Sequence, residues 1–268
     1  MQKEVGGMGP KKILTVDIGN TNVLLGIYTE KELAASWRIA TGRWRTADEW
    51  GFTLSGLLGM RSMDLGAVDA VVIGSVVPAI TQAWADMCRK NLGLEPLLVS
   101  SAVDCGLIVL YDHPKDVGAD RLANALAAFR RRGAAVILDF GTATTLDAVS
   151  ASGEYLGGAI MPGISISLDA LYSKAARLSG VDLFAPLTTI GRNTGDSLRS
   201  GIIYGFAAQA EGMIQRFLRE MGEGTAVLAT GGLAELVCGQ MCLKIEVDPF
   251  LTLEGLKAIY EMNCKDNI

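Results

Sequence analysis

Residues 13 to 28 read I-L-T-V-D-I-G-N-T-N-V-L-L-G-I-Y. Two runs of mainly aliphatic residues flank a short polar turn, a pattern typical of two strands joined by a hairpin. A single carboxylate, Asp17, stands near the end of the first run. Glycine and small polar residues follow it, and a glycine lets the backbone approach a ligand closely. The stretch predicts a strand that ends in a candidate binding turn.

The same pattern occurs again at residues 134 to 149, A-A-V-I-L-D-F-G-T-A-T-T-L-D-A-V. Asp139 takes the place of Asp17, and a Gly-Thr turn again leads into a second strand. In each copy a polar turn is followed by a third extended segment. Two copies of a three-strand unit predict a duplicated α/β domain.

The rest of the chain alternates between helical and extended patterns. Thr46 is a candidate N-cap for the first helix, because acidic residues fill the turn after it. The predicted helices span 46–60, 78–92, 118–131, 165–179, 197–221 and 252–263, and the further strands span 68–75, 97–99 and 226–230. Helices on both faces of two mixed sheets favour two α/β halves with a cleft between them.

Composition excludes several classes of protein. The chain has 268 residues, a net charge of -5 and a pI near 5.0, which argues against a nucleic-acid surface. No apolar run approaches the roughly 18 residues of a membrane-spanning helix. Five scattered cysteines predict free thiols in a reducing cytoplasm, and the first residues lack the apolar core of a signal peptide. The only basic run, residues 130–132, ends a predicted helix, where it would stabilise the helix dipole.

A single histidine, His113, limits the available chemistry. Zinc sites rich in histidine need more imidazoles, and a Ser-His-Asp triad would have to use this residue, which lies in a Pro-containing loop. Acid-base work is therefore assigned to carboxylates.

The two Asp-x-Gly turns suggest a phosphate site. Free N–H groups with Thr or Asn side chains can hold phosphate oxygens. A carboxylate repels phosphate, so a divalent ion or an ordered water must lie between them. The alternative is that each Asp caps its own turn. Two equivalent copies favour ligand binding.

A third polar stretch, residues 111 to 130, reads Y-D-H-P-K-D-V-G-A-D-R-L-A-N-A-L-A-A-F-R. Gly118 opens a helix whose first turn contains Asp120 and Arg121. An Asp at a helix N-terminus accepts a proton only if its site is desolvated or strongly coupled to a departing proton. The guanidinium could hold a substrate carboxylate in a bidentate contact. An ordinary capped helix with a surface Asp-Arg pair is equally open.

Eight ordered motifs, spread from Ile13 to about Asn263, together resemble type III pantothenate kinase. They are D-I-G-N-T-N at 17–22, R-T-A-D-E at 45–49, L-Y-D-x-P-K-x-V-G-A-D-R at 110–121, D-F-G-T-A-T-T at 139–145, G-E-Y-L-G-G-A-I-x-P-G at 153–163, I-G-R-N-T at 190–194, A-T-G-G-L-A at 229–234 and L-T-L-E-G-L at 251–256, where x is a position outside the match.

The resemblance implies the fold of the acetate and sugar kinase, Hsp70 and actin superfamily. This is an α/β fold of two duplicated ribonuclease-H-like (actin-like ATPase) domains, each with a mixed five-stranded sheet, and an active-site cleft between them. The implied organisation is a flexible lead-in over 1–11, an ATP-phosphate-binding domain over 12–117, and a domain over 118–268 that carries the pantothenate segment, the cation site and the dimer interface.

The implied activity is ATP-dependent phosphorylation of the primary hydroxyl of pantothenate, the first step towards coenzyme A. Asp120 matches the proton acceptor. Asp17 would act through Mg²⁺, and Asp139 matches the ligand of a monovalent cation, K⁺ or NH₄⁺. The implied ATP-binding residues are Asp17, Ile18, Gly19, Asn20, Thr21, Asn22, Val23, Leu24 and Thr142. The implied pantothenate contacts are Tyr111, Gly118, Ala119, Asp120, Arg121 and Thr194.

The resemblance also implies a homodimer, whose interface could use the 197–213 helix with Leu198, Ile202, Phe206 and Gln209. Two departures affect the substrate side: His113 stands where Asn is more usual, and V-D-C-G at 103–106 stands where Lys-Thr-Gly is expected. We assign no role to His113 or Cys105. The alternatives are a non-catalytic regulator, which would be expected to lose Asp120 or Asp139, and a kinase of another small hydroxylated substrate.

Overall fold

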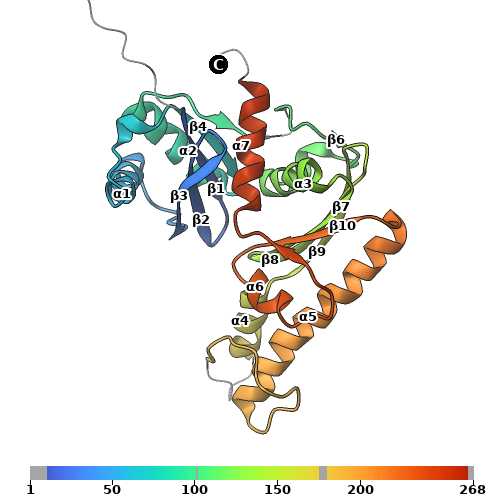
Figure 1. Cartoon of the computed structure of the whole chain (residues 1–268). Coiled ribbons are helices and arrows are strands. Elements are labelled where there is room, and N and C mark those ends of the chain that lie inside the picture. Colours follow the sequence, from blue (N-terminus) through green and yellow to red (C-terminus); the bar gives the residue numbers. More distant parts are fainter. Residues whose placement is uncertain (1–10, 101, 175–179, 265–268) are drawn as a thin grey trace, which may run out of the picture. The chain divides into compact units, whose positions relative to one another are not determined.

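The predicted hairpin around Asp17 forms the centre of a five-stranded sheet in the computed structural model, which describes residues 11–100, 102–174 and 180–264. The strand order is β3-β2-β1-β4-β5 (Figure 1). β1 pairs antiparallel with β2 and parallel with β4, so the sheet is mixed as predicted. The strands span Lys12–Ile18 (β1), Asn22–Thr29 (β2), Glu32–Ala40 (β3), Ala70–Ser75 (β4) and Leu97–Leu98 (β5).

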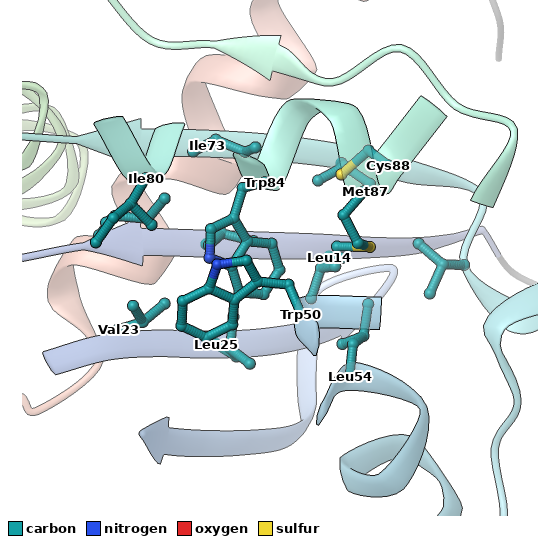
Figure 2. Packing of buried hydrophobic residues seen from close by; sticks show 14 of the residues in the cluster. Leu14, Val23, Leu25, Trp50, Leu54, Ile73, Ile80, Trp84, Met87 and Cys88 are labelled. Carbon is teal, nitrogen blue, oxygen red and sulfur yellow. The ribbon is translucent and has the colours of Figure 1, made fainter. Parts of the chain in front are cut away.

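Two helices cover one face of this sheet. α1 (Ala47–Gly59) and α2 (Pro78–Met87) pack on the buried side chains of β1 and β2, with the short 3₁₀ turn Leu65–Ala67 beside them. Trp50 and Trp84 are fully buried, with ring centroids 5.1 Å apart (Figure 2). Thr46 caps α1 in a capping box with Glu49, as predicted. The predicted helix 78–92 is correct in extent, but its last turn, Cys88–Leu92, is π-helical.

The opposite face of the first sheet is covered by α7 (Leu251–Asn263). Side chains alternate along a strand, so Thr15 and Asp17 point away from the α1-α2 face. Leu253 lies against Gly26, and Leu256 lies against Gly74; a Cβ on either glycine would come within 2.8 Å of these leucines. The face that carries Asp17 is therefore the α7 face.

The second sheet has six strands in the order β11-β10-β7-β8-β9-β6. Read from the other edge and without β6, the order is β9-β8-β7-β10-β11, which corresponds strand for strand to β3-β2-β1-β4-β5 in the first sheet. This correspondence confirms the duplication. The prediction of five strands missed β6, which joins the edge of β9. The strands span Ile108–Val109 (β6), Ala135–Phe140 (β7), Ala143–Val149 (β8), Glu154–Pro162 (β9), Ala226–Thr230 (β10) and Glu246–Val247 (β11).

Helices α3 to α6 lie wholly or mainly in the second unit. Buried residues of β7 and β8 form its core with α4, α5 and α6, while Asn124 of α3 lies beside Asp139 on the other face. The helices span Ala119–Arg132 (α3), Ile164–Lys174 (α4), Thr194–Met221 (α5) and Ala234–Cys238 (α6). The predicted helix 165–179 agrees with α4 as far as Lys174, and residues 175–179 lie outside the described residues.

The chain divides into compact units at other places than the predicted boundary after residue 117. Gly106–Val117 belongs to the second unit, because β6 pairs with β9. Gly118–Ala123 and the described residues from Leu253 onward belong to the first unit. These segments join units that are not adjacent to them along the chain, so a single boundary along the chain cannot describe the division. The predicted cleft between the halves stays a prediction. Within the described residues, no helix is long and apolar enough to cross a membrane.

Candidate active site

The turn after β1 is held by backbone and side-chain hydrogen bonds. The Gly19 N–H donates to the Asn22 carbonyl at 3.0 Å. From the end of β3, the Thr41 hydroxyl donates to the Gly19 carbonyl at 2.7 Å, and its N–H donates to the Thr21 carbonyl at 2.9 Å. Asn20 and Thr21 are exposed at the tip. The turn thus presents polar groups to solvent from a fixed backbone.

The start of α3 lies at the same edge and on the same face of the first sheet as Asp17. Asp17 is beside Gly74 in the neighbouring strand β4. A Cβ on Gly74 would lie 3.6 Å from the Ala119 Cβ, and a Cβ on Gly118 would lie 3.4 Å from Val76. The Val76 N–H in turn donates to the carbonyl of Ile18, at the end of β1. The first unit therefore brings the Asp17 turn and the Gly118–Arg121 segment together.

Asp120 is partly buried in the first turn of α3. Its Oδ1 accepts a hydrogen bond from the Arg121 backbone N–H at 2.8 Å. Desolvation by burial raises the pKa of the Asp120 carboxyl, although that hydrogen bond and the Arg121 charge act in the opposite direction. A carboxylate with a raised pKa is a better proton acceptor than an exposed one. Only 7% of Arg121 is exposed, so the alternative of a surface Asp-Arg pair is wrong.

Gly118 makes room for the Asp120 carboxylate. A Cβ at residue 118 would lie 2.4 Å from the Asp120 Oδ1, closer than any normal contact. The glycine is therefore required by space rather than by backbone conformation, because its φ is not positive.

Asp139 lies at the end of β7 in the second unit, where Asp17 lies at the end of β1 in the first. The Asn124 amide donates to its Oδ2 at 3.2 Å. Its Oδ1 lies 2.6 Å from the position that a Cβ on Gly231 would occupy and 3.4 Å from that of Gly141. Gly231 has φ +100°, which favours glycine. The Asp139 carboxylate therefore lies directly beside two glycine-containing turns.

Two of the remaining predicted residues lie apart from Asp139 within the second unit. The Tyr111 ring lies against Gly157 of β9. Gly157 pairs with Ala148 of β8, and Ala148 pairs with Val136 near the start of β7. Tyr111 is therefore strands away from Asp139 and near the other end of the sheet. Thr194 is exposed at the start of α5. Thr142, by contrast, belongs to the same β7-β8 turn as Asp139.

The sequence did not identify three residues that shape these turns: Thr41, Asn124 and Gly231. Asn124 had a weak signal, because it is an amide four residues after Asp120 on a stripe of alanine and leucine. Gly231 lies in the A-T-G-G-L-A motif without an assigned role. Thr41 had no local signal, because its partner is 22 residues away.

The described residues include no group of three or more His, Cys, Asp or Glu placed to hold a metal ion.

Comparisons with known proteins agree with these features. A family model described as type III pantothenate kinase matches residues 13–216. A type III pantothenate kinase from Moorella thermoacetica is 47% identical over 252 residues, which cover 94% of this chain and 99% of the relative.

Two solved structures share the fold at low sequence identity. Component A of (R)-2-hydroxyglutaryl-CoA dehydratase from Acidaminococcus fermentans has a TM-score of 0.55 at 15% identity, covering 93% of this chain and 97% of that one. MreB 5 of Spiroplasma citri has a TM-score of 0.54 at 11% identity, covering 96% and 98%. The fold class is thus the predicted actin-like ATPase type. With three quarters of its length matched by the family model and nearly half of its aligned residues identical to a full-length relative, the chain belongs to the type III pantothenate kinase family.

Proposed function

We propose that this chain transfers the γ-phosphoryl group of ATP to the primary hydroxyl of pantothenate, the first step of coenzyme A synthesis. Family membership supports the reaction class and both substrates. The observation that carries the proposal in the chain itself is Asp120, a carboxylate with a raised pKa at the same sheet edge as a phosphate-type turn. Phosphoryl transfer depends mainly on positioning and charge neutralisation, which such a small set of groups can provide.

In this proposal Asp120 accepts the proton of the attacking hydroxyl. The segment Asp17–Leu24 binds the ATP phosphates, and Thr142 contacts ATP from the second copy of the turn. The divalent ion is Mg²⁺, held by Asp17 together with the phosphates. When bound, it neutralises the charge that develops on the transferred group. The exposed polar tip of the first turn, held by Thr41, supports this assignment.

Pantothenate carries a carboxylate, which we assign to the Arg121 guanidinium. Gly118 and Ala119 would allow the substrate to approach the helix start, and Tyr111 and Thr194 would be further contacts. Arg121 supports this assignment by its charge, because a guanidinium can bind a carboxylate through two parallel hydrogen bonds. Its place next to Asp120 in the first turn of α3 would hold the substrate beside the assigned base.

Three further assignments follow from the family. Asp139 would hold K⁺ or NH₄⁺, which the glycine surroundings of its Oδ1 support. A homodimer would use α5, where Ile202 is buried but Gln209 is exposed. We propose a cytoplasmic location, where ATP and pantothenate are available.

One assay tests the function: ATP turnover with and without pantothenate, in potassium and in sodium. We expect turnover to require pantothenate and Asp120→Asn to lower it about 10²- to 10⁴-fold. Asp64→Asn, on an exposed surface carboxylate, is the control and should match the wild type. ATP turnover that ignores pantothenate would reject this kinase and leave a regulator or another substrate. Full activity of Asp120→Asn would reject only the assignment of Asp120 as the base. Turnover that is the same in potassium and in sodium would reject only the cation role of Asp139.

A further inference from the structure

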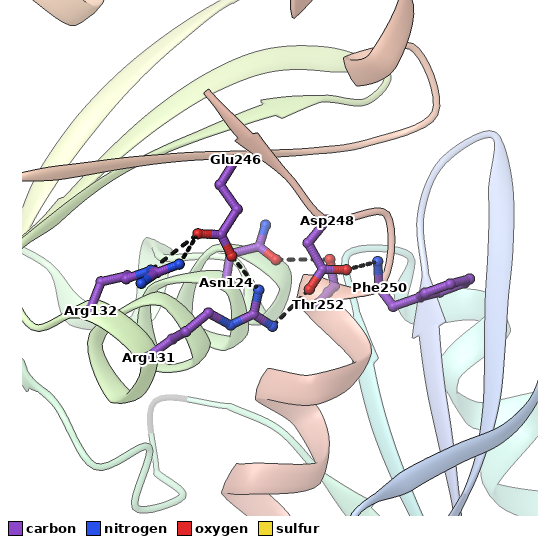
Figure 3. Close-up of polar contacts among 7 residues, drawn as sticks. All are labelled: Asn124, Arg131, Arg132, Glu246, Asp248, Phe250 and Thr252. Atoms are coloured by element: carbon purple, nitrogen blue, oxygen red, sulfur yellow. Dashed lines mark hydrogen bonds and ion pairs between the residues drawn. The ribbon is translucent and has the colours of Figure 1, made fainter. Parts of the chain in front are cut away.

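A chain of hydrogen bonds ends on the Asp139 carboxylate. The Thr252 hydroxyl, at the start of α7, donates to the Asn124 Oδ1 at 2.8 Å (Figure 3). The Asn124 Nδ2 donates to the Asp139 Oδ2 at 3.2 Å. Asn124 is 1% exposed and Thr252 is 6% exposed, so water does not compete for these bonds.

The chain has one satisfactory direction. An ionised carboxylate only accepts hydrogen bonds, so the NH₂ group of Asn124 must face Asp139. Its carbonyl oxygen then faces Thr252, whose hydroxyl must donate. A flipped amide would set two oxygens against each other at Asp139. The carboxylate therefore sets the amide orientation, and the Thr252 hydroxyl holds the amide in place by donating to the Asn124 Oδ1.

The segment that carries Thr252 is itself held to α3. The Arg131 guanidinium donates to Asp248 at 2.7 Å and to Glu246 at 3.1 Å (Figure 3). The Phe250 N–H donates to the other Asp248 oxygen at 2.8 Å, which shapes the turn before α7. The basic end of α3, predicted to act on the helix dipole, thus also makes ion pairs that fix the start of α7.

The consequence for Asp139 is a fixed orientation. One oxygen, Oδ2, is held by Asn124. The other, Oδ1, lies close to Gly231 and Gly141, where a Cβ at either residue would meet it at 2.6 or 3.4 Å. The Asn124 bond is one restraint on the χ angles of Asp139, and its loss would widen the range of orientations of the carboxylate.

We infer that Asn124 and Thr252 are positioning residues for a cation site at Asp139. The inference rests on the proposed function, which makes Asp139 a ligand of a monovalent cation. Neither residue touches the cation: Asn124 acts through the carboxylate, and Thr252 acts through Asn124. Their loss should weaken cation binding more than it weakens binding of pantothenate.

The test compares Asn124→Leu, which keeps the side-chain size but removes the donor, with Thr252→Val, which removes only the hydroxyl. Thr15→Val is the matched control, because Thr15 is a buried threonine in the first unit whose hydroxyl donates to the Gly26 carbonyl at 3.2 Å. Asp139→Asn is the reference for a protein that has lost the cation site. Each protein is unfolded thermally without substrates over a series of KCl concentrations, with tetramethylammonium chloride keeping the ionic strength constant. The potassium dependence and the pantothenate KM are then measured in the kinase assay.

We expect potassium to raise the unfolding temperature of the wild type. Its half-saturating concentration should rise about tenfold or more in Asn124→Leu, because a hydrogen bond to a charged group is lost. Thr252→Val should show a smaller rise, Thr15→Val none, and the pantothenate KM should stay near wild type in all of them. If Asn124→Leu does not fold, Thr252→Val decides the question.

Two outcomes would overturn the inference, and they are distinguishable. A wild type that responds to potassium while both variants keep the same half-saturation would reject the positioning role alone. A wild type without any response, equal to Asp139→Asn, would reject the cation site and the positioning role with it. Pantothenate-dependent turnover by the same wild type would then show that the kinase function stands.

Discussion

Replacing Gly118 with alanine should move the Asp120 carboxylate without damaging the fold. The added Cβ would lie 2.4 Å from Oδ1, whereas the nearest ordinary contact at this position, to Val76, is 3.4 Å. The carboxylate must therefore shift by about 1 Å. Because the clash is with the free end of a side chain, the backbone need not move. The φ of Gly118 is not positive, so alanine can adopt the backbone conformation.

A misplacement of about 1 Å in a reacting group can cost about 10²-fold in rate. We therefore expect Gly118→Ala to lower kcat about 10²-fold while the unfolding temperature stays at or slightly above the wild-type value. The assay is pantothenate-dependent ATP turnover at saturating substrates, followed by thermal unfolding of the same sample.

The matched control is Gly56→Ala in α1, where an added Cβ meets no other atom within 4 Å. This change should leave kcat unaltered and stabilise the protein by up to about 1 kcal/mol through helix propensity. Wild-type kcat in Gly118→Ala would refute the reasoning, since it would show that the observed position of the carboxylate is not the working one. A Gly118→Ala variant that loses both kcat and thermal stability would also refute the reasoning, because the lower kcat could then be caused by damage to the fold.

Three further outcomes are expected. Burial raises the pKa of the Asp120 carboxyl, so the folded protein binds this proton more readily than the unfolded chain, and this contribution to stability falls as pH rises through that raised value. Asp120→Asn should therefore unfold at higher denaturant concentration than wild type at neutral pH, and a gap that fails to narrow in acid would contradict the assignment. Trp84→Ala, in the fully buried pair of Figure 2, should cost about 3–5 kcal/mol by chemical denaturation; a loss below about 1 kcal/mol would mean that the core repacks. Gly231→Ala should lose about 1–3 kcal/mol, because its φ is +100° and the Cβ would lie 2.6 Å from the Phe140 backbone; unchanged stability would show that this turn can adjust.

The elements that could be predicted were those with long, periodic signals. The duplicated hairpins predicted three antiparallel strands in each sheet, β1 to β3 and β7 to β9. The complete strand order came from the structure. β6 and β11 are only two residues long. Strands this short have no period of their own and exist because β9 and β10 offer them a partner edge.

The candidate site was predictable only where its residues are local in sequence. Gly118 and Asp120 are two residues apart, so a helix start was enough to associate them. Asn124 was read as part of an alanine-rich helix, because its partners Asp139 and Thr252 lie 15 and 128 residues away. Such bonds depend on tertiary packing, which no local pattern encodes.

The surroundings of Asp17 and Asp139 differ at the end of the neighbouring parallel strand, β4 in the first sheet and β10 in the second. β4 ends with Ser75, whose hydroxyl accepts a hydrogen bond from the Val77 N–H at 3.1 Å just before α2. After β10 the chain continues with Gly231, whose missing side chain leaves space that an oxygen of Asp139 approaches. The sheet positions of Asp17 and Asp139 are the same, so the strands cannot decide their chemistry. The proposed ligands of the two aspartates, nucleotide phosphates with a divalent ion at Asp17 and a monovalent cation at Asp139, must therefore differ because of the surrounding turns. We therefore expect the residue that follows Gly74 or Thr230 in the parallel neighbour strand, Ser75 or Gly231, to contribute to the difference in ligand between the two halves.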